Sequence, residues 1–327
     1  MRCPTLAELP PPPEGKTGWP WTRETPPLPD VRADGSPWPR ISIVTPSYNQ
    51  AQFIEETIRS ILSQGYPDLE YVIIDGGSSD QSAEIIAKYE PWLADWLSER
   101  DKGQSHAINK GLARSTGDLF NWINSDDLLL PGTLAAVGGA SRHDEAIAGA
   151  VLNFGVGASM VIENKGLSPA RLIAGDIGAA YHQPGLWFRP CRIASVGGID
   201  ESLHYAFDFD LTLRYLAKYP ELIYLPQILA SFRLHETSKT TSQQHDFHRE
   251  RIFVYNKILN HPDCASLKQI CSLRLRRHAW WERLDTIVRS NDSAASRALT
   301  ILLEICADPS VRMSSLSLGA VRRVLLS

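Results

Sequence analysis

The sequence LFNWINSDD, residues 119–127, joins an apolar run to two adjacent carboxylates. Residues 119–123 are predicted to form a buried strand, so Asp126 and Asp127 follow its carboxyl end. In open α/β sheets, ligands bind at this edge. Two neighbouring carboxylates repel each other unless a cation lies between them, and their oxygens suit Mg²⁺ or Mn²⁺. The alternative is a helix N-cap, in which an Asp side chain accepts backbone N–H bonds.

The segments around this stretch alternate between strand and helix patterns. Such alternation predicts an α/β domain whose parallel-rich sheet is covered by helices on both faces. The predicted strands are 41–45, 70–75, 92–98, 119–123, 148–154, 160–162 and 186–189. The predicted helices are 52–64, 81–89, 104–113 and 209–219, with another around Leu134 and an apolar run at 222–234.

Composition divides the chain into three parts. Residues 1–40 are rich in Pro and isolated Trp without a period, so we expect an extended surface arm or partial disorder. Residues 41–241 carry the α/β alternation. Residues 242–327 have helical patterns alone and are basic, with 13 Lys/Arg against 8 Asp/Glu. We therefore expect an N-terminal arm, one catalytic or binding domain, and a helical C-terminal extension.

Charge and cysteine usage narrow the class of protein. The 327 residues are 43% hydrophobic and carry a formal net charge of −4, which predicts a globular protein without general affinity for nucleic acid. No apolar run is long enough to cross a bilayer, and the N-terminus lacks the layout of a secretory signal. Five scattered cysteines favour reduced thiols and a cytoplasmic protein.

Four predicted strand ends bring polar residues to one edge of the sheet. They contain an aromatic ring, carboxylates, hydroxyls and glycines. This set suits a nucleoside diphosphate, because a ring can stack on the base, a carboxylate can accept from base or ribose, and a metal can hold the diphosphate. The four segments are TPSYN at 45–49, DGGSSD at 75–80, DKGQS at 101–105 and NSDD at 124–127.

The order of these motifs resembles family 2 glycosyltransferases of the GT-A fold. The resemblance continues through NKG at 109–111, GGIDE at 197–201, FDFDL at 207–211 and FRLH at 232–235, and it covers about residues 41–241. It implies an inverting transfer of sugar from a nucleotide-diphosphate donor, expected to be a UDP-sugar, to a sugar or lipid-linked acceptor. Such enzymes act in polysaccharide or glycoconjugate synthesis. The QxxRW motif of processive members is absent, which favours a single-transfer enzyme.

The resemblance also implies roles for residues on the donor side. Tyr48 would pack on the base and Asp75 would read it, while Asp126, Asp127 and His235 would hold Mn²⁺ or Mg²⁺. Asn124 replaces the first Asp of the metal motif, so its amide contributes no charge. The expected nucleotide-sugar set is Thr45, Pro46, Tyr48, Asn49, Asp75, Ser78, Asn109, Asn124, Ser125 and Arg233. For Arg233 the alternative is a surface ion pair, and for His235 a structural role.

An inverting transfer needs a group that takes the proton of the acceptor hydroxyl. Asp208 resembles the general base of the family, although Phe207 stands where relatives carry a Glu. The alternative is that Asp208 and Asp210 only stabilise a helix N-terminus through its dipole. The resemblance places His182, Gln183 and Trp187 on the acceptor side, and a core position is the alternative for the Trp.

Two other functions fit parts of the pattern. Asn124 and the missing Glu before Asp208 motivate a non-catalytic nucleotide-sugar binding protein with a degenerate metal motif. A nucleotidyltransferase is disfavoured, because no glycine-rich basic triphosphate loop occurs. The basic C-terminal helices, with Trp280 and Trp281, suggest peripheral contact with the inner face of the membrane. A helical cap with a solvated basic face is the alternative.

Overall fold

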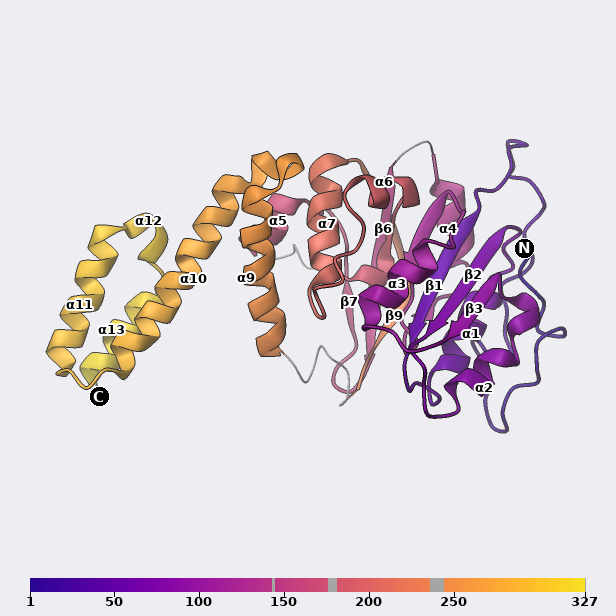
Figure 1. Cartoon of the computed structure of the whole chain (residues 1–327), viewed down its shortest axis with the longest axis horizontal. Coiled ribbons are helices and arrows are strands. Elements are labelled where there is room, and N and C mark those ends of the chain that lie inside the picture. Colours follow the sequence, from indigo (N-terminus) through magenta and orange to yellow (C-terminus); the bar gives the residue numbers. More distant parts are fainter. Residues whose placement is uncertain (143–144, 176–180, 236–243, 327) are drawn as a thin grey trace. The chain divides into compact units, whose positions relative to one another are not determined.

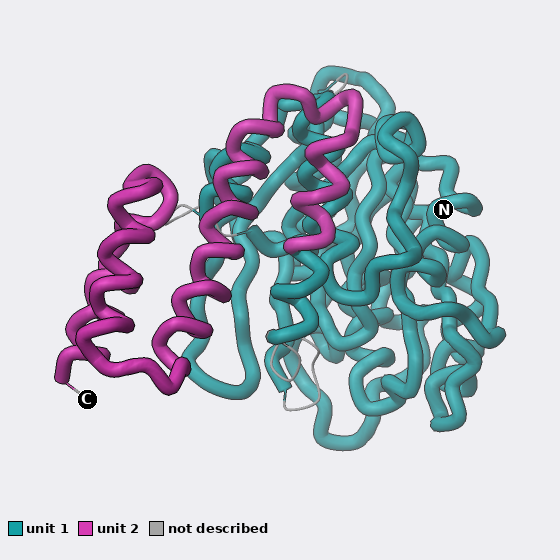
Figure 2. The backbone as a smooth tube through the Cα atoms, turned by 60° about the vertical axis from the view of Figure 1, so that its left-hand side comes forward, with its two compact units in different colours: residues 1–251 teal, residues 252–327 magenta. Residues whose placement is uncertain are grey.

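A computed structural model describes residues 1–142, 145–175, 181–235 and 244–326. The chain divides into two compact units, Met1–Arg251 and Ile252–Ser327 (Figure 2). The domain boundary expected from the sequence, at residues 241 and 242, lies in segment 236–243, outside the described residues.

The first unit contains a four-stranded parallel sheet with strand order β3-β2-β1-β4 (Figure 1). Register pairs Ser47 with Asp75 and Val44 with Trp122, so these strands end at one edge. The strands are β1 (Ile41–Ser47), β2 (Leu69–Asp75), β3 (Asp95–Ser98) and β4 (Leu119–Trp122), and the helices between them are α1 (Ile54–Leu62), α2 (Ser82–Ala87), η1 (Glu90–Trp92) and α3 (Gln104–Leu112).

Side-chain alternation along β1 explains why helices cover both faces of this sheet. Ile41 and Ile43 pack in the main hydrophobic core with Ile58 of α1. Val44 points to the opposite face, where it meets Gly111 of α3. A Cβ on Gly111 would lie 2.4 Å from Cγ1 of Val44, so this close packing requires glycine. The predicted two-sided α/β layering is confirmed.

A second, mixed sheet continues from the carboxylate stretch. Its strand order is β5-β9-β6-β7, and β8 also pairs with β6. Strands β6 and β9 run parallel, while the other pairs are antiparallel. A bridge between Phe120 and Phe188 connects the two sheets. The strands are β5 (Leu128–Leu129), β6 (Ala146–Gly155), β7 (Met160–Ile162), β8 (Leu186–Trp187) and β9 (Leu222–Leu234).

The remaining helices of this part follow the strands of the second sheet. They are α4 (Thr133–Ala140), α5 (Pro169–Ala174), η2 (Gln183–Gly185), α6 (Pro190–Ser195) and α7 (Phe207–Lys218), and α9 (Gln244–Asn260) spans the division between the units. Helix α7 begins within two residues of the predicted start and carries Asp208 in its first turn.

The second unit is entirely helical. Its core contains Leu284, Ile301 and Val324, and Trp280 donates a hydrogen bond from Nε1 to Oγ of Ser317 at 3.0 Å. Its helices are η3 (Pro262–Leu267), α10 (Lys268–Arg289), α11 (Ala294–Ala307), α12 (Pro309–Arg312) and α13 (Ser315–Leu326). Within the described parts of the chain, no helix is both long and apolar enough to span a bilayer.

The Pro-rich arm packs against the first unit through buried side chains. Cys3 and Leu9 belong to the main core, and Trp21 is 5% exposed. Arg59 of α1 is 1% exposed and donates to the carbonyls of Pro10, Pro20 and Trp21. A buried guanidinium needs such acceptors, so the arm supplies hydrogen bonds that α1 requires.

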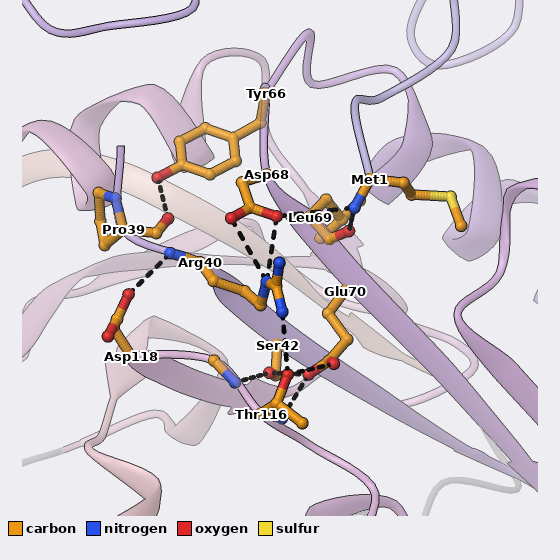
Figure 3. A network of polar contacts seen from close by, with 11 residues as sticks. Met1, Pro39, Arg40, Ser42, Tyr66, Asp68, Leu69, Glu70, Thr116 and Asp118 are labelled. Carbon is orange, nitrogen blue, oxygen red and sulfur yellow. Dashed lines mark hydrogen bonds and ion pairs between the residues drawn. The ribbon is translucent and has the colours of Figure 1, made fainter. Parts of the chain in front are cut away.

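Polar contacts join the starts of the strands, at the edge opposite the carboxylate stretch (Figure 3). Arg40, just before β1, donates from Nε to Asp68 at 3.1 Å and from its backbone N–H to Asp118 at 2.9 Å. Thr116 donates to both oxygens of Glu70, at 2.6 and 2.7 Å. These bonds fix the relative positions of β1, β2 and β4, and therefore of the residues at their far ends.

Candidate functional site

One pocket of about 980 Å³ lies at the carboxyl edge of the parallel sheet. This volume is typical of a small-molecule site. The pocket is lined by the segments that follow β1 to β4 and by the start of α7. Of the residues predicted from the sequence, it brings together Pro46, Tyr48, Asn124, Ser125, Asp126, His182, Gln183, Asp208 and His235.

Tyr48 and Asp101 form the part of the pocket nearest to β1 and β2. The Tyr48 side chain is 61% exposed, which leaves its ring available for stacking. Asp101 accepts a hydrogen bond from the backbone of Gly103 at 2.8 Å. A Cβ on Gly76 would lie 2.8 Å from Oδ2 of Asp101, so glycine allows the loop after β2 to approach this carboxylate.

Asp75, predicted to read the base, is fully buried and holds the loop that follows β2. It accepts from the backbone and hydroxyl of Ser78, at 2.9 and 2.5 Å, and from Oγ of Ser98 at 2.7 Å. Asn49 joins the same loop, since its backbone donates to Oγ of Ser78. Thr45 is buried beside the Tyr71 hydroxyl, at 3.0 Å. These residues support the pocket wall.

Asp126 and His235 lie against each other in the pocket. Nε2 of His235 is 3.0 Å from Oδ2 of Asp126, and both side chains are partly exposed. The pair joins the segment after β4 to the end of β9, which the sequence separates by 109 residues. A carboxylate and an imidazole on facing segments can both coordinate a divalent ion.

Asp127 has a different environment from Asp126. It is 0% exposed, and its two oxygens accept from the Arg233 backbone at 2.9 Å and from Nδ2 of Asn124 at 3.0 Å. Burial, followed by the charge of Asp126, raises the pKa of Asp127 well above its ordinary value. Its position favours a supporting role, in which it ties β9 to the segment after β4, over the predicted metal contact.

Asn124 has a physical reason to be an amide. Its Oδ1 accepts from Nε2 of Gln104 at 2.7 Å while its Nδ2 donates to Asp127. A carboxylate at position 124 could not donate a hydrogen bond to Asp127, and it would place a second acid next to that buried side chain. The departure from the family motif therefore matches the buried state of Asp127.

The side chain of Arg233 makes contacts that differ from those expected of a nucleotide-sugar ligand. It pairs with Glu56 at 2.8 Å, donates to the Asp126 carbonyl at 2.9 Å, and lies between the rings of Phe53 and Phe154. The sequence-based assignment of Arg233 to the nucleotide-sugar set therefore needs correction, because these contacts already engage the guanidinium and Arg233 is not among the residues that line the pocket. Its contacts fit a role in positioning the segment that carries Asp126.

Asp208 opens α7 and is half-buried at the pocket. Oδ1 accepts the backbone N–H of Phe209 at 2.7 Å. Burial raises the pKa of Asp208 to about 6, although hydrogen bonds from Phe209 and the Tyr181 hydroxyl and the charge of Arg251 act in the opposite direction. A carboxylate with this pKa is well suited to accept a proton near neutral pH.

Asp210 has a structural role, as one half of a buried ion pair with Arg214. It is 0% exposed and accepts from Nε of Arg214 at 2.9 Å. Arg214 also donates to the carbonyl of Val196, just before the GGIDE segment, and to that of Gly198 within it. Asn109 reaches the same segment from α3, with bonds to the Ile199 carbonyl and to Glu201, both 2.9 Å. These contacts hold the loop before α7.

The three residues predicted for the acceptor side separate into two groups. His182 and Gln183 line the pocket, whereas Trp187 is 0% exposed in the main core. The prediction for Trp187 therefore needs correction, because β8 turns its side chain inward. Burial lowers the pKa of His182 to about 4, so this ring is neutral at pH 7. Gln183 donates to Asn121 at 2.7 Å.

The lining residues without an assigned role from the sequence include Arg100, His204, Phe247 and Arg251. Arg100 neighbours the DKGQS segment, so the strand-end argument could have included it. Phe247 and Arg251 belong to α9, beyond the last family motif, and no local pattern distinguishes them.

The donor set available to a metal is small. Among residues 1–142, 145–175, 181–235 and 244–326, no group of three or more His, Cys, Asp or Glu side chains could hold an ion. Asp126 and His235 supply two ligands, and Mg²⁺ or Mn²⁺ sites commonly take the remaining oxygens from substrate phosphates and water. The residues present therefore fit an ion that binds together with a diphosphate.

The sequence comparisons show similarity to glycosyltransferases over part of the chain. The family model for glycosyl transferase family 2 matches residues 42–159. An uncharacterized glycosyltransferase of Mycobacterium tuberculosis is 29% identical over 181 residues, which cover 54% of this chain and 68% of the relative. The putative teichuronic acid biosynthesis glycosyltransferase TuaG of Bacillus subtilis is 36% identical over 92 residues, which cover 27% and 36%.

Solved structures share the fold. TarS 1-349 of S. aureus in complex with UDP-GlcNAc has a TM-score of 0.61 at 21% identity, covering 73% of this chain and 72% of that chain. The mannosyltransferase PcManGT of Pyrobaculum calidifontis, in complex with GDP-Man and Mn²⁺, has a TM-score of 0.56 at 18% identity, covering 91% and 89%. The fold is that of the GT-A glycosyltransferases. The chain is a glycosyltransferase, and its residues 42–159 are similar to glycosyl transferase family 2.

Proposed function

We propose that this chain is an inverting, single-transfer glycosyltransferase that uses a nucleotide-diphosphate sugar, preferably a UDP-sugar. The observation that carries the proposal is the shared pocket of Asp208 and the Asp126–His235 pair. One group suits proton removal from an acceptor, and the other suits an ion at a diphosphate. TarS, which was solved with UDP-GlcNAc, supports the UDP preference, while PcManGT with GDP-Man shows that the fold accepts other nucleotides.

The proposed reaction is a single displacement. The acceptor hydroxyl attacks the anomeric carbon while Asp208 takes its proton, and the bond from that carbon to the diphosphate oxygen breaks. The nucleoside diphosphate leaves from the opposite face, which inverts the configuration. Tyr48 stacks on the base, and Asp101, which lines the pocket, takes the base-reading role that the family resemblance implied for Asp75.

In this proposal Asp126 and His235 hold Mn²⁺ or Mg²⁺. When bound, the ion supplies positive charge to the diphosphate leaving group. Asn124 and Ser125 border the same part of the pocket and are placed to contact the ribose or the sugar. His182 and Gln183 then lie on the acceptor side with Asp208.

A screen of nucleotide sugars with Mn²⁺, scored by release of nucleoside diphosphate, tests this function. We expect one donor to be turned over, and product linkage analysis to show inverted configuration. Retained configuration would contradict the mechanism. Tight nucleotide binding without turnover of any donor and acceptor pair would instead favour the non-catalytic binding protein.

The pH dependence of turnover should report the ionisation of Asp208. Because its pKa is raised to about 6, the base is protonated in acid and ionised above that value. At saturating substrates, kcat is expected to rise with pH through about 6 and then level off. His182, with a pKa of about 4, stays neutral across this range. A pH-independent kcat between about pH 5 and 8 would contradict the assignment.

We further propose a place in polysaccharide or glycoconjugate synthesis at the inner face of the membrane, with a sugar or lipid-linked acceptor. TuaG, a putative teichuronic acid biosynthesis glycosyltransferase, supports the pathway class, and all five cysteines are free, which suits a cytoplasmic protein. The second unit exposes Leu299, Leu303, Leu318 and Leu325 on the adjacent helices α11 and α13, together with Arg322 and Arg323. Exposed leucines beside arginines suit an anionic lipid surface.

Flotation with vesicles tests the membrane contact. The protein is expected to float with vesicles that contain anionic lipid and to remain unbound with neutral ones. Replacing Leu303 and Leu325 by Ser should weaken binding, since both side chains are exposed and outside the core of that unit. Equal recovery from both vesicle types would contradict the proposal.

A further inference from the structure

Arg251 is a cation of the pocket with an unsatisfied donor. It lies on α9, lines the pocket, and stacks its guanidinium over the ring of Phe209 at 4.4 Å. Its Nε is buried and has no hydrogen-bond partner. Burying a donor without a partner is unfavourable. The stacked ring leaves the edge of the guanidinium, where its N–H groups project, for a ligand oxygen.

Contacts of the neighbouring residues hold Arg251 in place. The Glu250 carboxylate accepts three backbone N–H groups in the turn before α7, from His204 at 2.9 Å and from Tyr205 and Ala206 at 2.8 Å. One turn earlier, the ring of Phe247 packs on Tyr205 at 5.3 Å. The start of α9 is therefore fixed to the segment that carries Asp208, and a preplaced side chain loses little entropy on binding.

The location of Arg251 assigns it to the acceptor half of the pocket. Phe209, on which it stacks, directly follows Asp208, and the charge of Arg251 favours the ionised form of that carboxylate. The ion expected for the diphosphate would be held by Asp126 and His235. Arg251 is therefore a cation next to the proposed base, Asp208, and is placed to face the acceptor from which Asp208 takes a proton.

We propose that Arg251 forms an oxyanion subsite for the acceptor, so that the preferred acceptor carries a phosphate or carboxylate close to the reacting hydroxyl. This inference rests on the proposed function, since it requires Asp208 to lie on the acceptor side. A guanidinium binds either group through paired N–H bonds, and the test separates the two sources.

The experiment is calorimetry on the full chain saturated with UDP and Mn²⁺. The probes are glycerol 3-phosphate and glucuronate, with glycerol and glucose as neutral counterparts. We expect at least one charged probe to bind, and Arg251→Met to weaken it by about 10- to 100-fold. Methionine keeps an apolar contact with Phe209 but removes the charge. The affinity for UDP should stay unchanged. If the Met variant fails to fold, Arg251→Gln provides the uncharged comparison.

Arg192→Met is the matched control. Arg192 also stacks on a ring, that of Tyr219 at 4.3 Å, but it is not among the residues that line the pocket. Its replacement should leave both charged probes bound as in the wild type. Loss of UDP affinity in Arg251→Met would overturn the inference, because Arg251 would then serve the donor diphosphate. If the wild type binds UDP but neither charged probe, the inference about Arg251 is overturned while the proposed function stands. Failure of the wild type to bind any nucleotide would overturn the proposed function as well.

Discussion

Asp208→Asn is expected to lower kcat by about 10²–10⁴-fold while the affinity for nucleotide stays near that of the wild type. The amide keeps the size of the side chain and can still accept from Phe209, but it cannot take the proton of the acceptor hydroxyl. Single-turnover kinetics with a radiolabelled donor would measure the chemical step, and calorimetry would measure nucleotide binding.

Asp210→Asn is the control from the same helix turn. Asp210 is buried against Arg214, so its replacement leaves a buried guanidinium without its counter-charge. Breaking such a pair costs about 3–5 kcal/mol of folding free energy, and the melting temperature should fall. Molecules that remain folded should turn over normally. Wild-type turnover in Asp208→Asn together with an inactive, fully folded Asp210→Asn would mean that the wrong carboxylate has been assigned.

The strands and their common edge could be predicted because periodicity and spacing encode them locally. Residues 119–123 show no alternation of apolar and polar side chains, which is the pattern expected of a strand that is covered on both faces. The structure has β4 at Leu119–Trp122. The parallel register then brings Asp75 and Asp126 to one edge without further information. This argument, together with the family motifs, predicted Tyr48, Asp126 and Asp208 at the site, and all three line the pocket.

The side-chain environments could not be predicted in the same way. Two adjacent acids look alike in sequence, yet Asp126 faces His235 while Asp127 is buried under Arg233 and Asn124. The difference arises from β9, which is more than 90 residues further along the chain. Arg233 likewise points to Glu56 because the rings of Phe53 and Phe154 hold its guanidinium there.

Removal of the metal should affect this enzyme as strongly as loss of the base. Chelation with EDTA is expected to abolish transfer, and Mn²⁺ or Mg²⁺ should restore it. Asp126→Ala removes one of the two protein ligands, so donor binding and kcat/KM should fall by about 10²–10³-fold, as expected when a metal no longer stabilises the leaving diphosphate. Titration of nucleotide affinity against Mn²⁺ separates a metal effect from a folding effect, because only the former depends on the ion.

Asp127→Asn distinguishes the two neighbouring acids. Asp127 already accepts two hydrogen bonds in the interior, and burial favours its protonated form, so the neutral amide should affect stability more than metal binding. We expect this variant to keep the Mn²⁺ dependence of nucleotide binding that Asp126→Ala loses. The opposite result would make Asp127 the ligand. Full turnover of the wild type in EDTA would show that transfer requires no metal. The charge of the diphosphate would then have to be neutralised by protein cations such as Arg100, which lines the same pocket.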